Sequence, residues 1–369
     1  MKDIGTKVRL IFIPYLILYL VTISGYTFLH WLLFIENNVF SVYEDILNFF
    51  IPMILPGIPI LIWLRPRVKL LDLKKTPAGK DPIVGFIMLA WIGMVVPLVI
   101  AQEYLISATG ELTRLADISE INNVLPTKYY MVDKYIFMKE QACKMPEYSV
   151  SGKRNQYFDM SLLIAVPIFS KKQKKQEFDF IRYDRKTGAY FFNGEEVSIV
   201  ELGKLNPNAQ ATLITYKDSI TDSRYDKVRN FYFKLHKPEI KNAYGWLTLR
   251  YDKTISNRLP KSEKNEQFDE FIDECYRDLD TLQLNEFVYL TRIGKSFKLD
   301  KFQEMTRDDI FFNKNNSVNF FERINEPFER RNGHKLLWLL GTILVGSSMF
   351  FLLLLSKPLK NNIPRIGYF

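Results

Sequence analysis

The chain has 369 residues, with 50 basic and 41 acidic side chains and a net charge of +9. The excess is spread evenly: +3 in residues 1–102, +3 in residues 103–335 and +3 in the remainder. A nucleic-acid-binding domain concentrates basic residues in one patch, so this distribution excludes nucleic acid as a partner and is typical of a membrane protein with positive cytoplasmic ends.

Four uncharged, apolar stretches predict membrane-spanning helices. Such a helix needs roughly 20 apolar residues to cross a hydrocarbon layer about 30 Å thick. The stretches are Leu10–Ile35, Ile46–Leu64, Pro82–Gln102 and Leu336–Ser356. The first is about twice as long as the apolar part of a cleavable signal peptide, so we expect it to remain as an anchor.

Prolines in the second and third stretches predict kinked helices. Proline removes a backbone N–H and bends a helix, so the freed carbonyls need partners in neighbouring helices or in a hydrated cavity. The predicted kink residues are Pro52, Pro56, Gly57, Pro59 and Pro97. A bent helix could line a transport path, but no intramembrane acid or base accompanies these prolines, so helix packing is the favoured interpretation.

Basic residues beside the spans predict which ends face the cytoplasm. The connection after the second span carries six of them, whereas the connection between the first two spans carries only acids. The six are Arg65, Arg67, Lys69, Lys74, Lys75 and Lys80. We therefore expect both termini and the 65–81 loop in the cytoplasm and residues 103–335 outside.

The polar segment between the third and fourth spans predicts an α+β domain. Runs of β-branched and aromatic residues predict strands within 128–138, 157–169, 246–256 and 285–293. Helical spacing of apolar residues predicts a helix over Glu263–Leu284, with a shorter one around Lys301–Arg307. Residues 103–121 are expected to continue the third span as an amphipathic stalk.

The predicted fold class is thus an integral membrane protein with an inserted α+β extracytoplasmic domain. Residues 1–102 hold three helical spans and the basic loop 65–81. Residues 103–335 form the domain, 336–356 the fourth span and 357–369 a cytoplasmic tail.

Two cysteines, Cys143 and Cys275, fall in the segment expected outside the cytoplasm. An oxidising compartment would allow them to form a disulfide; the alternative is two unrelated thiols, one of them on the apolar face of a helix. No metal site is predicted, because the chain has no CxxC and its three histidines lie far apart: His30, His236 and His334.

No catalytic or cofactor-binding residue is predicted either. The nucleophile elbow GxSxG, the zinc motif HExxH and a glycine-rich dinucleotide turn are all absent. Ser347 and Ser348 lie in the fourth span without a base to activate them, so Gly346 and its neighbours are expected to serve close helix packing.

Several strings together resemble the membrane-anchored accessory region that precedes the protease core in rhomboid-family proteins of Bacteroidetes-type bacteria. They are HWLLFIENNVFSVYEDILNFFIPMILPGIPILIWLRPRVKLL, IAQEYLISATGELT, TKYY, VSGKRNQYFDM, LRYDKTISNRL and INEPFERRNGHKLLW. The rhomboid core itself is a six-helix unit with a GxSG serine and a later histidine, and neither motif is present here. The resemblance therefore implies an accessory region without the catalytic core.

The function predicted from the sequence is a non-enzymatic, multi-pass protein of the bacterial inner membrane. Its envelope-facing domain would bind or sense a partner, and the expected partners are the lipid bilayer and a membrane or envelope protein. Two alternatives stay open: a substrate-presenting component of a rhomboid-type proteolytic system, and a transporter component.

Overall fold

The structure, a computed structural model, describes residues 2–36, 42–73, 81–171, 180–184, 189–192, 195–197, 211–214, 230–235, 243–307, 309 and 318–360. The chain divides into two compact units. The helical unit holds residues 1–110, 294–297 and 327–369, and the sheet unit holds residues 111–293 and 298–326. The first boundary lies eight residues beyond the predicted one, because the third long helix continues to Thr109.

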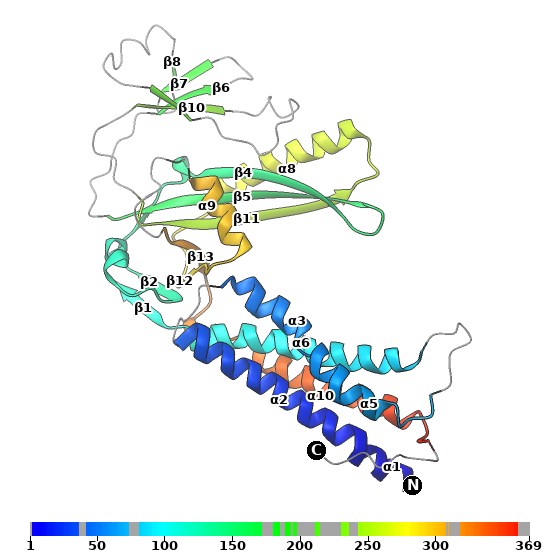
Figure 1. The fold of residues 1–369 in the computed structure, drawn as a ribbon. Helices are drawn as coiled ribbons and strands as arrows, with labels where there is room; N and C mark the ends of the chain where they lie inside the picture. Colours follow the sequence, from blue (N-terminus) through cyan, green and yellow to red (C-terminus); the bar gives the residue numbers. More distant parts are fainter. Residues whose placement is uncertain are drawn as a thin grey trace. The chain divides into compact units, whose positions relative to one another are not determined.

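Four helices of the helical unit are long and apolar enough to cross a membrane, as the sequence predicts: Ile4–Glu36, Ile46–Val68, Ile83–Thr109 and Phe328–Leu355 (Figure 1). The first comprises α1 (Lys2–Lys7), a π-helical turn (Val8–Phe12), α2 (Ile13–His30) and a second π-helical turn (Trp31–Glu36). The second comprises Ile46–Phe50, α3 (Ile51–Ile54), α4 (Gly57–Pro59), Ile60–Leu64 and α5 (Arg65–Val68). The third is α6 (Ile83–Thr109), and the fourth is a 3-10 turn (Phe328–Arg330) with α10 (Lys335–Leu355).

The outer surface of these helices is apolar. Ile62 is 71% exposed, Leu344 is 68% exposed and Trp338 is 67% exposed. Only 6% of the most apolar stretch in the fourth helix is buried within the unit. Soluble proteins rarely expose apolar surface of this extent, so the helices require an apolar environment or a covering partner.

The prolines affect the two proline-containing spans differently. The second span is interrupted by a turn at Leu55 and Pro56, where the Trp91 indole N–H of α6 donates to the Met53 carbonyl over 2.8 Å. Helix α6, in contrast, runs without interruption through Pro97. Side chains of neighbouring helices thus bond to backbone carbonyls beside the prolines.

Tyr19 of α2 donates a hydrogen bond to a backbone carbonyl of α6 that has no donor within its own helix. Pro97 has no N–H to donate to the carbonyl of Gly93, four residues earlier. The Tyr19 hydroxyl, fully buried, donates to that carbonyl over 2.7 Å. The bond therefore joins α2 to α6 at the one carbonyl that Pro97 leaves without its helical partner.

A double-mutant cycle measures this compensation. We expect Tyr19→Phe to lower the free energy of unfolding in detergent by about 1–2 kcal/mol, because it leaves a buried carbonyl without a donor. In a Pro97→Ala background, the alanine supplies the missing N–H, so the same substitution should cost less than half as much. Tyr104→Phe, which removes a hydroxyl without a hydrogen bond among the described residues, is the control. Equal costs in both backgrounds would contradict the assignment.

Three basic segments, distant in sequence, meet at one end of the helical unit. The Lys7 ammonium donates to the Leu355 carbonyl over 3.5 Å, and the Arg67 guanidinium donates to the Leu10 carbonyl over 3.1 Å. Leu71 forms an antiparallel bridge with Leu359, after the fourth helix. Of the six predicted topology residues, Arg65, Arg67 and Lys69 lie at this end, which is named the basic end below; Lys74, Lys75 and Lys80 lie outside the described residues.

Arg331 lies at the opposite end of α10. Its guanidinium donates to the carbonyls of Ser107 and Ala108, the last turn of α6. A cation is favourable at a helix C-terminus, because the terminal carbonyls there have no intrahelical partner. This basic residue is thus used for capping.

The sheet unit is built on an eight-stranded mixed sheet in the order β1-β2-β12-β13-β11-β5-β3, with β4 also paired to β5. Its strands are β1 (Leu112–Leu115), β2 (Tyr129–Val132), β3 (Ile136–Phe137), β4 (Cys143–Ser151), β5 (Tyr157–Phe169), β11 (Gly245–Ser256), β12 (Tyr289–Arg292) and β13 (Phe320–Ile324). Two pairs are parallel, β1 with β2 and β11 with β13; the others are antiparallel. The predicted strands within 128–138, 157–169, 246–256 and 285–293 are confirmed.

A second, five-stranded antiparallel sheet has the order β8-β7-β6-β10-β9. Its strands are β6 (Phe180–Asp184), β7 (Ala189–Phe192), β8 (Glu195–Val197), β9 (Ala211–Ile214) and β10 (Asn230–Leu235).

The predicted helical stalk over residues 103–121 is wrong in its second half. Helix α6 ends at Thr109, and Gly110 has an extended backbone with ψ 126°. The chain then forms β1 and a 3-10 helix, Ile118–Asn123. The apolar side chains of this segment pack in the core of the sheet unit, where Leu115 and Ile118 are buried.

Two helices cover opposite faces of the long strand β5, and Figure 1 shows them on either side of it. Helix α8 (Lys261–Thr281) packs on the face that holds Leu162 and Ile164, and α9 (Phe297–Thr306) contributes Phe302 to the cluster on the face that holds Leu163 and Ala165. Successive strand residues point to opposite faces, so a strand covered on both sides is apolar throughout. The predictions of both helices are confirmed.

Candidate functional site

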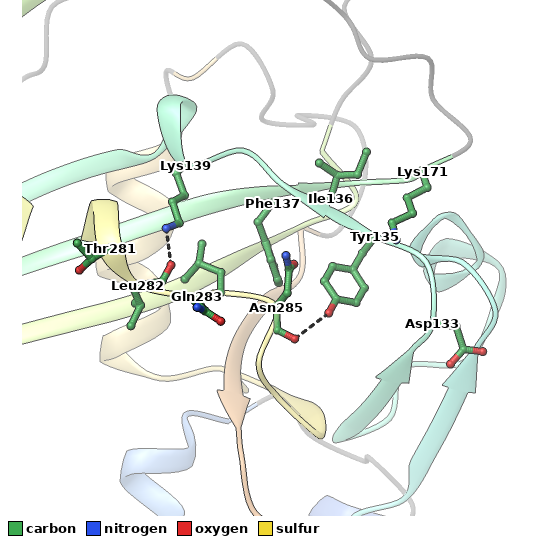
Figure 2. Close-up of a pocket in the computed structure, with 11 residues that line it drawn as sticks. Asp133, Tyr135, Ile136, Phe137, Lys139, Lys171, Thr281, Leu282, Gln283 and Asn285 are labelled. Carbon is green, nitrogen blue, oxygen red and sulfur yellow. Dashed lines mark hydrogen bonds between the residues drawn. The ribbon is translucent and has the colours of Figure 1, made fainter. Parts of the chain in front are cut away.

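A hollow of about 610 Å³ lies beside the C-terminal end of α8 in the sheet unit (Figure 2). Its volume falls in the range of small-molecule sites, about 300–1,000 Å³. The lining comes from the β2–β3 connection, strand β3 and the turn after it, the chain just after β5, and the end of α8 with the chain that follows it. The lining residues are Asp133, Tyr135, Ile136, Phe137, Lys139, Lys171, Thr281, Leu282, Gln283, Leu284 and Asn285. This region is named the α8 hollow below.

Lys139 closes the C-terminal end of α8. Its ammonium donates to the Asp280 carbonyl over 3.1 Å and to the Leu282 carbonyl, as Figure 2 shows for the second bond. The last carbonyls of a helix lack intrahelical partners and carry the negative end of its dipole, so an ammonium satisfies both needs. The α8 hollow therefore has one wall, the end of α8, that is fixed to the turn after β3.

Three aromatic rings lie together in and beside the α8 hollow. The Tyr135 ring lies 5.0 Å from Phe137 and 5.1 Å from Phe287, measured between ring centroids, and Phe137 lies 6.0 Å from Phe287. The Tyr135 hydroxyl donates to the Asn285 carbonyl over 3.4 Å. Burial raises the pKa of Tyr135, so this hydroxyl stays a donor at neutral pH. Clustered aromatic rings with a polar rim are typical of binding surfaces.

Lys144 of β4 lies against the same helix. Its ammonium lies 4.3 Å from the centre of the Tyr276 ring, a cation–π geometry. Burial lowers the pKa of Lys144, and the Asp280 carboxylate acts in the opposite direction. Lysines from the β3–β4 edge of the sheet therefore neutralise the end of an otherwise acidic helix.

The α8 hollow has few charged groups. Its charged groups are one carboxylate and two ammonium groups, and Lys139 is already bonded to backbone carbonyls. In the part of the chain that the structure describes, no three His, Cys, Asp or Glu side chains are grouped so that they could hold a metal ion. The predictions that the protein has no catalytic, cofactor-binding or metal-binding residue remain predictions.

The two cysteines are not joined in the structure. Cys275 belongs to the buried cluster on the α8 face of the sheet, and Cys143 belongs to the cluster on the α9 face, so the sheet lies between them. Burial raises the pKa of Cys275 to about 12, and Glu274 and Asp278 act in the same direction. Cys275 is therefore protonated at neutral pH and a weak nucleophile.

A buried polar network joins α2 to α6 in the helical unit. The side-chain amide of Gln102, fully buried, donates to Thr27 Oγ1 and to the Leu98 carbonyl, each over 3.2 Å. Its carbonyl oxygen then accepts from His30 Nδ1 over 2.7 Å, so this nitrogen carries a proton. A titratable side chain, His30, thus lies within the apolar helices. The amide nitrogen and the carbonyl oxygen of Gln102 both form hydrogen bonds within this network, so the network holds α2 against α6.

The five predicted kink residues belong to the helical unit, whereas the α8 hollow belongs to the sheet unit. The hollow was not predicted. Its residues come from segments about 150 positions apart and carry no motif; the one local signal is the aromatic pair Tyr135 and Phe137 followed by Lys139.

Comparisons of the chain with protein-family models, with curated proteins and with solved structures give no match. The resemblance to a rhomboid accessory region therefore remains a prediction.

Proposed function

We propose that the chain is a multi-pass protein of the bacterial inner membrane whose sheet unit binds an envelope partner through the α8 hollow. Both termini face the cytoplasm, and the sheet unit lies on the far side. The carrying observation is the basic end: the segments before the first span, after the second and after the fourth meet at one end of four apolar helices. Positive charge favours the cytoplasmic side, so these segments support one orientation together.

The α8 hollow supports the binding role. It has a suitable volume, an aromatic cluster, and polar groups held by bonds to the end of α8. The partner is a protein segment that places an apolar side chain against Tyr135 and Phe137. Gln283 and Asn285, on the rim, supply hydrogen bonds.

Membrane placement is tested with reporter fusions in cells. A periplasmic phosphatase reporter at Asn38 is expected to be active, and one at Thr76 or at the C-terminus inactive. The chain should also remain in the membrane pellet after alkaline carbonate extraction. Active reporters at Thr76 and at the C-terminus would reverse the orientation, and release into the supernatant would overturn membrane insertion.

Binding is tested by photo-crosslinking from the α8 hollow. A benzophenone amino acid at Gln283 is expected to give one discrete adduct, and the adduct should disappear in a Phe137→Ala background. The same amino acid at Glu266, exposed on α8 and outside the hollow, is the matched control. If both positions give the same adducts, or if position 283 gives none, the binding role of the hollow is wrong.

A further inference from the structure

The basic end carries a strong excess of positive charge. Among the residues whose side chains the structure describes, seven basic side chains lie there, against two carboxylates, those of Asp72 and Asp81. The Asp81 carboxylate is already bonded to the backbone N–H of Ile83 over 3.0 Å, at the start of α6. The basic residues are Lys7, Arg9, Arg65, Arg67, Lys69, Lys357 and Lys360.

The fold, rather than sequence proximity, brings these residues together. Asp72 N donates to the Pro358 carbonyl over 2.8 Å, and Lys360 N donates to the Leu70 carbonyl over 2.9 Å. This two-stranded bridge joins the chain after α5 to the chain after α10. Lys7 and Leu10, which contact α10 and Arg67 respectively, are three residues apart and lie on one face of the first helix.

Two of the basic side chains, Lys7 and Arg67, have buried N–H groups without an acceptor among the described residues. Lys7 is only 5% exposed, and among the described residues its ammonium has one long bond, 3.5 Å, to the Leu355 carbonyl. An ammonium has three N–H donors, so two remain. Among the described residues, Arg67 Nε is buried without an acceptor, and the central carbon of the guanidinium lies 5.2 Å from the Trp63 ring centre. Buried cations are stable only when paired, so the pair is suited to an anion with several acceptor oxygens.

Apolar surface continues from the basic end along the helices. Ile13 follows Arg9 on the first helix and is 45% exposed, and Leu352 precedes Leu355 on α10 and is 64% exposed. A ligand with an anionic head and hydrocarbon chains would meet both the cations and this surface. A free anion would use only the cations.

We infer that the basic end binds the phosphate group of an anionic phospholipid, with Lys7 and Arg67 as its hydrogen-bond donors. The acyl chains lie along the exposed apolar faces of the first helix and α10. Basic pockets between membrane helices on the cytoplasmic side are suited to such headgroups. The inference rests on the proposed membrane insertion.

The test is native mass spectrometry of the detergent-purified full chain with phosphatidylglycerol or phosphatidylcholine of identical acyl chains. Phosphatidylglycerol is expected to bind about tenfold more tightly, because both lipids carry the phosphate but the basic end repels the choline cation of phosphatidylcholine. Lys7→Gln with Arg67→Gln should remove this preference. Arg330→Gln with Lys335→Gln, which removes the same charge at the other end of α10, should leave it unchanged.

Three results would overturn the inference: equal binding of the two lipids, equal loss in the control pair, or displacement of the lipid by millimolar inorganic phosphate, which would indicate a free-anion site. Carbonate extraction is measured on the same variants. A chain that stays in the membrane but shows no lipid preference would refute the lipid inference and leave the proposed membrane insertion standing. Should the Lys7 and Arg67 pair not remain monodisperse, Arg65→Gln with Lys69→Gln is used, and about threefold weaker phosphatidylglycerol binding is expected from the lost attraction.

Discussion

Replacing Phe268 by alanine is expected to lower the free energy of unfolding of the sheet unit by about 3–5 kcal/mol, the usual range for a buried phenylalanine. Phe268 is 2% exposed and lies with Phe271 on the face of α8 that meets β5. Truncation removes apolar contacts and leaves a cavity, because the sheet on the other side cannot collapse into it. The measurement is denaturant unfolding of the detergent-purified full chain, followed by hydrogen exchange in residues 261–281.

The matched control is Glu270→Ala, two positions along the same helix on the exposed face. Alanine has high helix propensity and Glu270 has no packing role, so the change should stay within about 0.5 kcal/mol. If Phe268→Ala has as small an effect as the control, α8 does not pack on the sheet as described. Faster exchange confined to α8 would show instead that the helix detaches while the sheet persists.

The long periodic or long apolar elements of this chain could be predicted from the sequence. The four apolar helices are each longer than a bilayer requires, so length alone identifies them. Helix α8 carries apolar residues on one face only, because its other face meets solvent. Strand β5 is apolar on both faces over its second half, yet its β-branched and aromatic residues still indicated a strand.

The elements that were missed have weak local signals. Strand β4 contains Lys144, Pro146 and Glu147, and its conformation comes from nine-residue pairing with β5. As an edge strand it tolerates Pro146, whose missing N–H would disrupt a central strand. For strand β1 the sequence favours helix, because no proline separates its residues from the end of the preceding long helix; Gly110 alone marks that end.

The α8 hollow could not be predicted for a related reason. Its two walls are the turn after β3 and the chain after α8, and they meet only because both flank the same sheet. Lys139 reads as an exposed lysine in the sequence, and its bonds to the end of α8 depend on that tertiary arrangement. The basic end can be predicted only in part. Its charged residues are visible in the sequence, whereas the Leu71–Leu359 bridge that brings them together is not.

The second large effect is expected from Gly346→Leu in α10. A Cβ atom at Gly346 would lie 3.2 Å from the Gly93 carbonyl oxygen and 3.3 Å from Gly93 Cα, so the two helices cross at their glycines. A leucine side chain there forces α10 away from α6 and strains the Tyr19 bond to the same carbonyl. Overpacking of this kind costs about 1–3 kcal/mol. Close approach through small residues is a common contact between helices in lipid, and this contact confirms the packing role predicted for Gly346.

Gly341→Leu is the control, because a Cβ atom at Gly341 meets nothing within 4 Å. Both substitutions add the same apolar side chain to the same helix, so helix propensity and lipid affinity cancel between them. Thermal unfolding in detergent, followed by size-exclusion chromatography, should show a lower melting temperature for Gly346→Leu only, with Gly346→Ala intermediate. Equal melting temperatures for the two leucine variants would mean that α10 does not contact α6 at this crossing, and the four-helix arrangement would need to be redrawn.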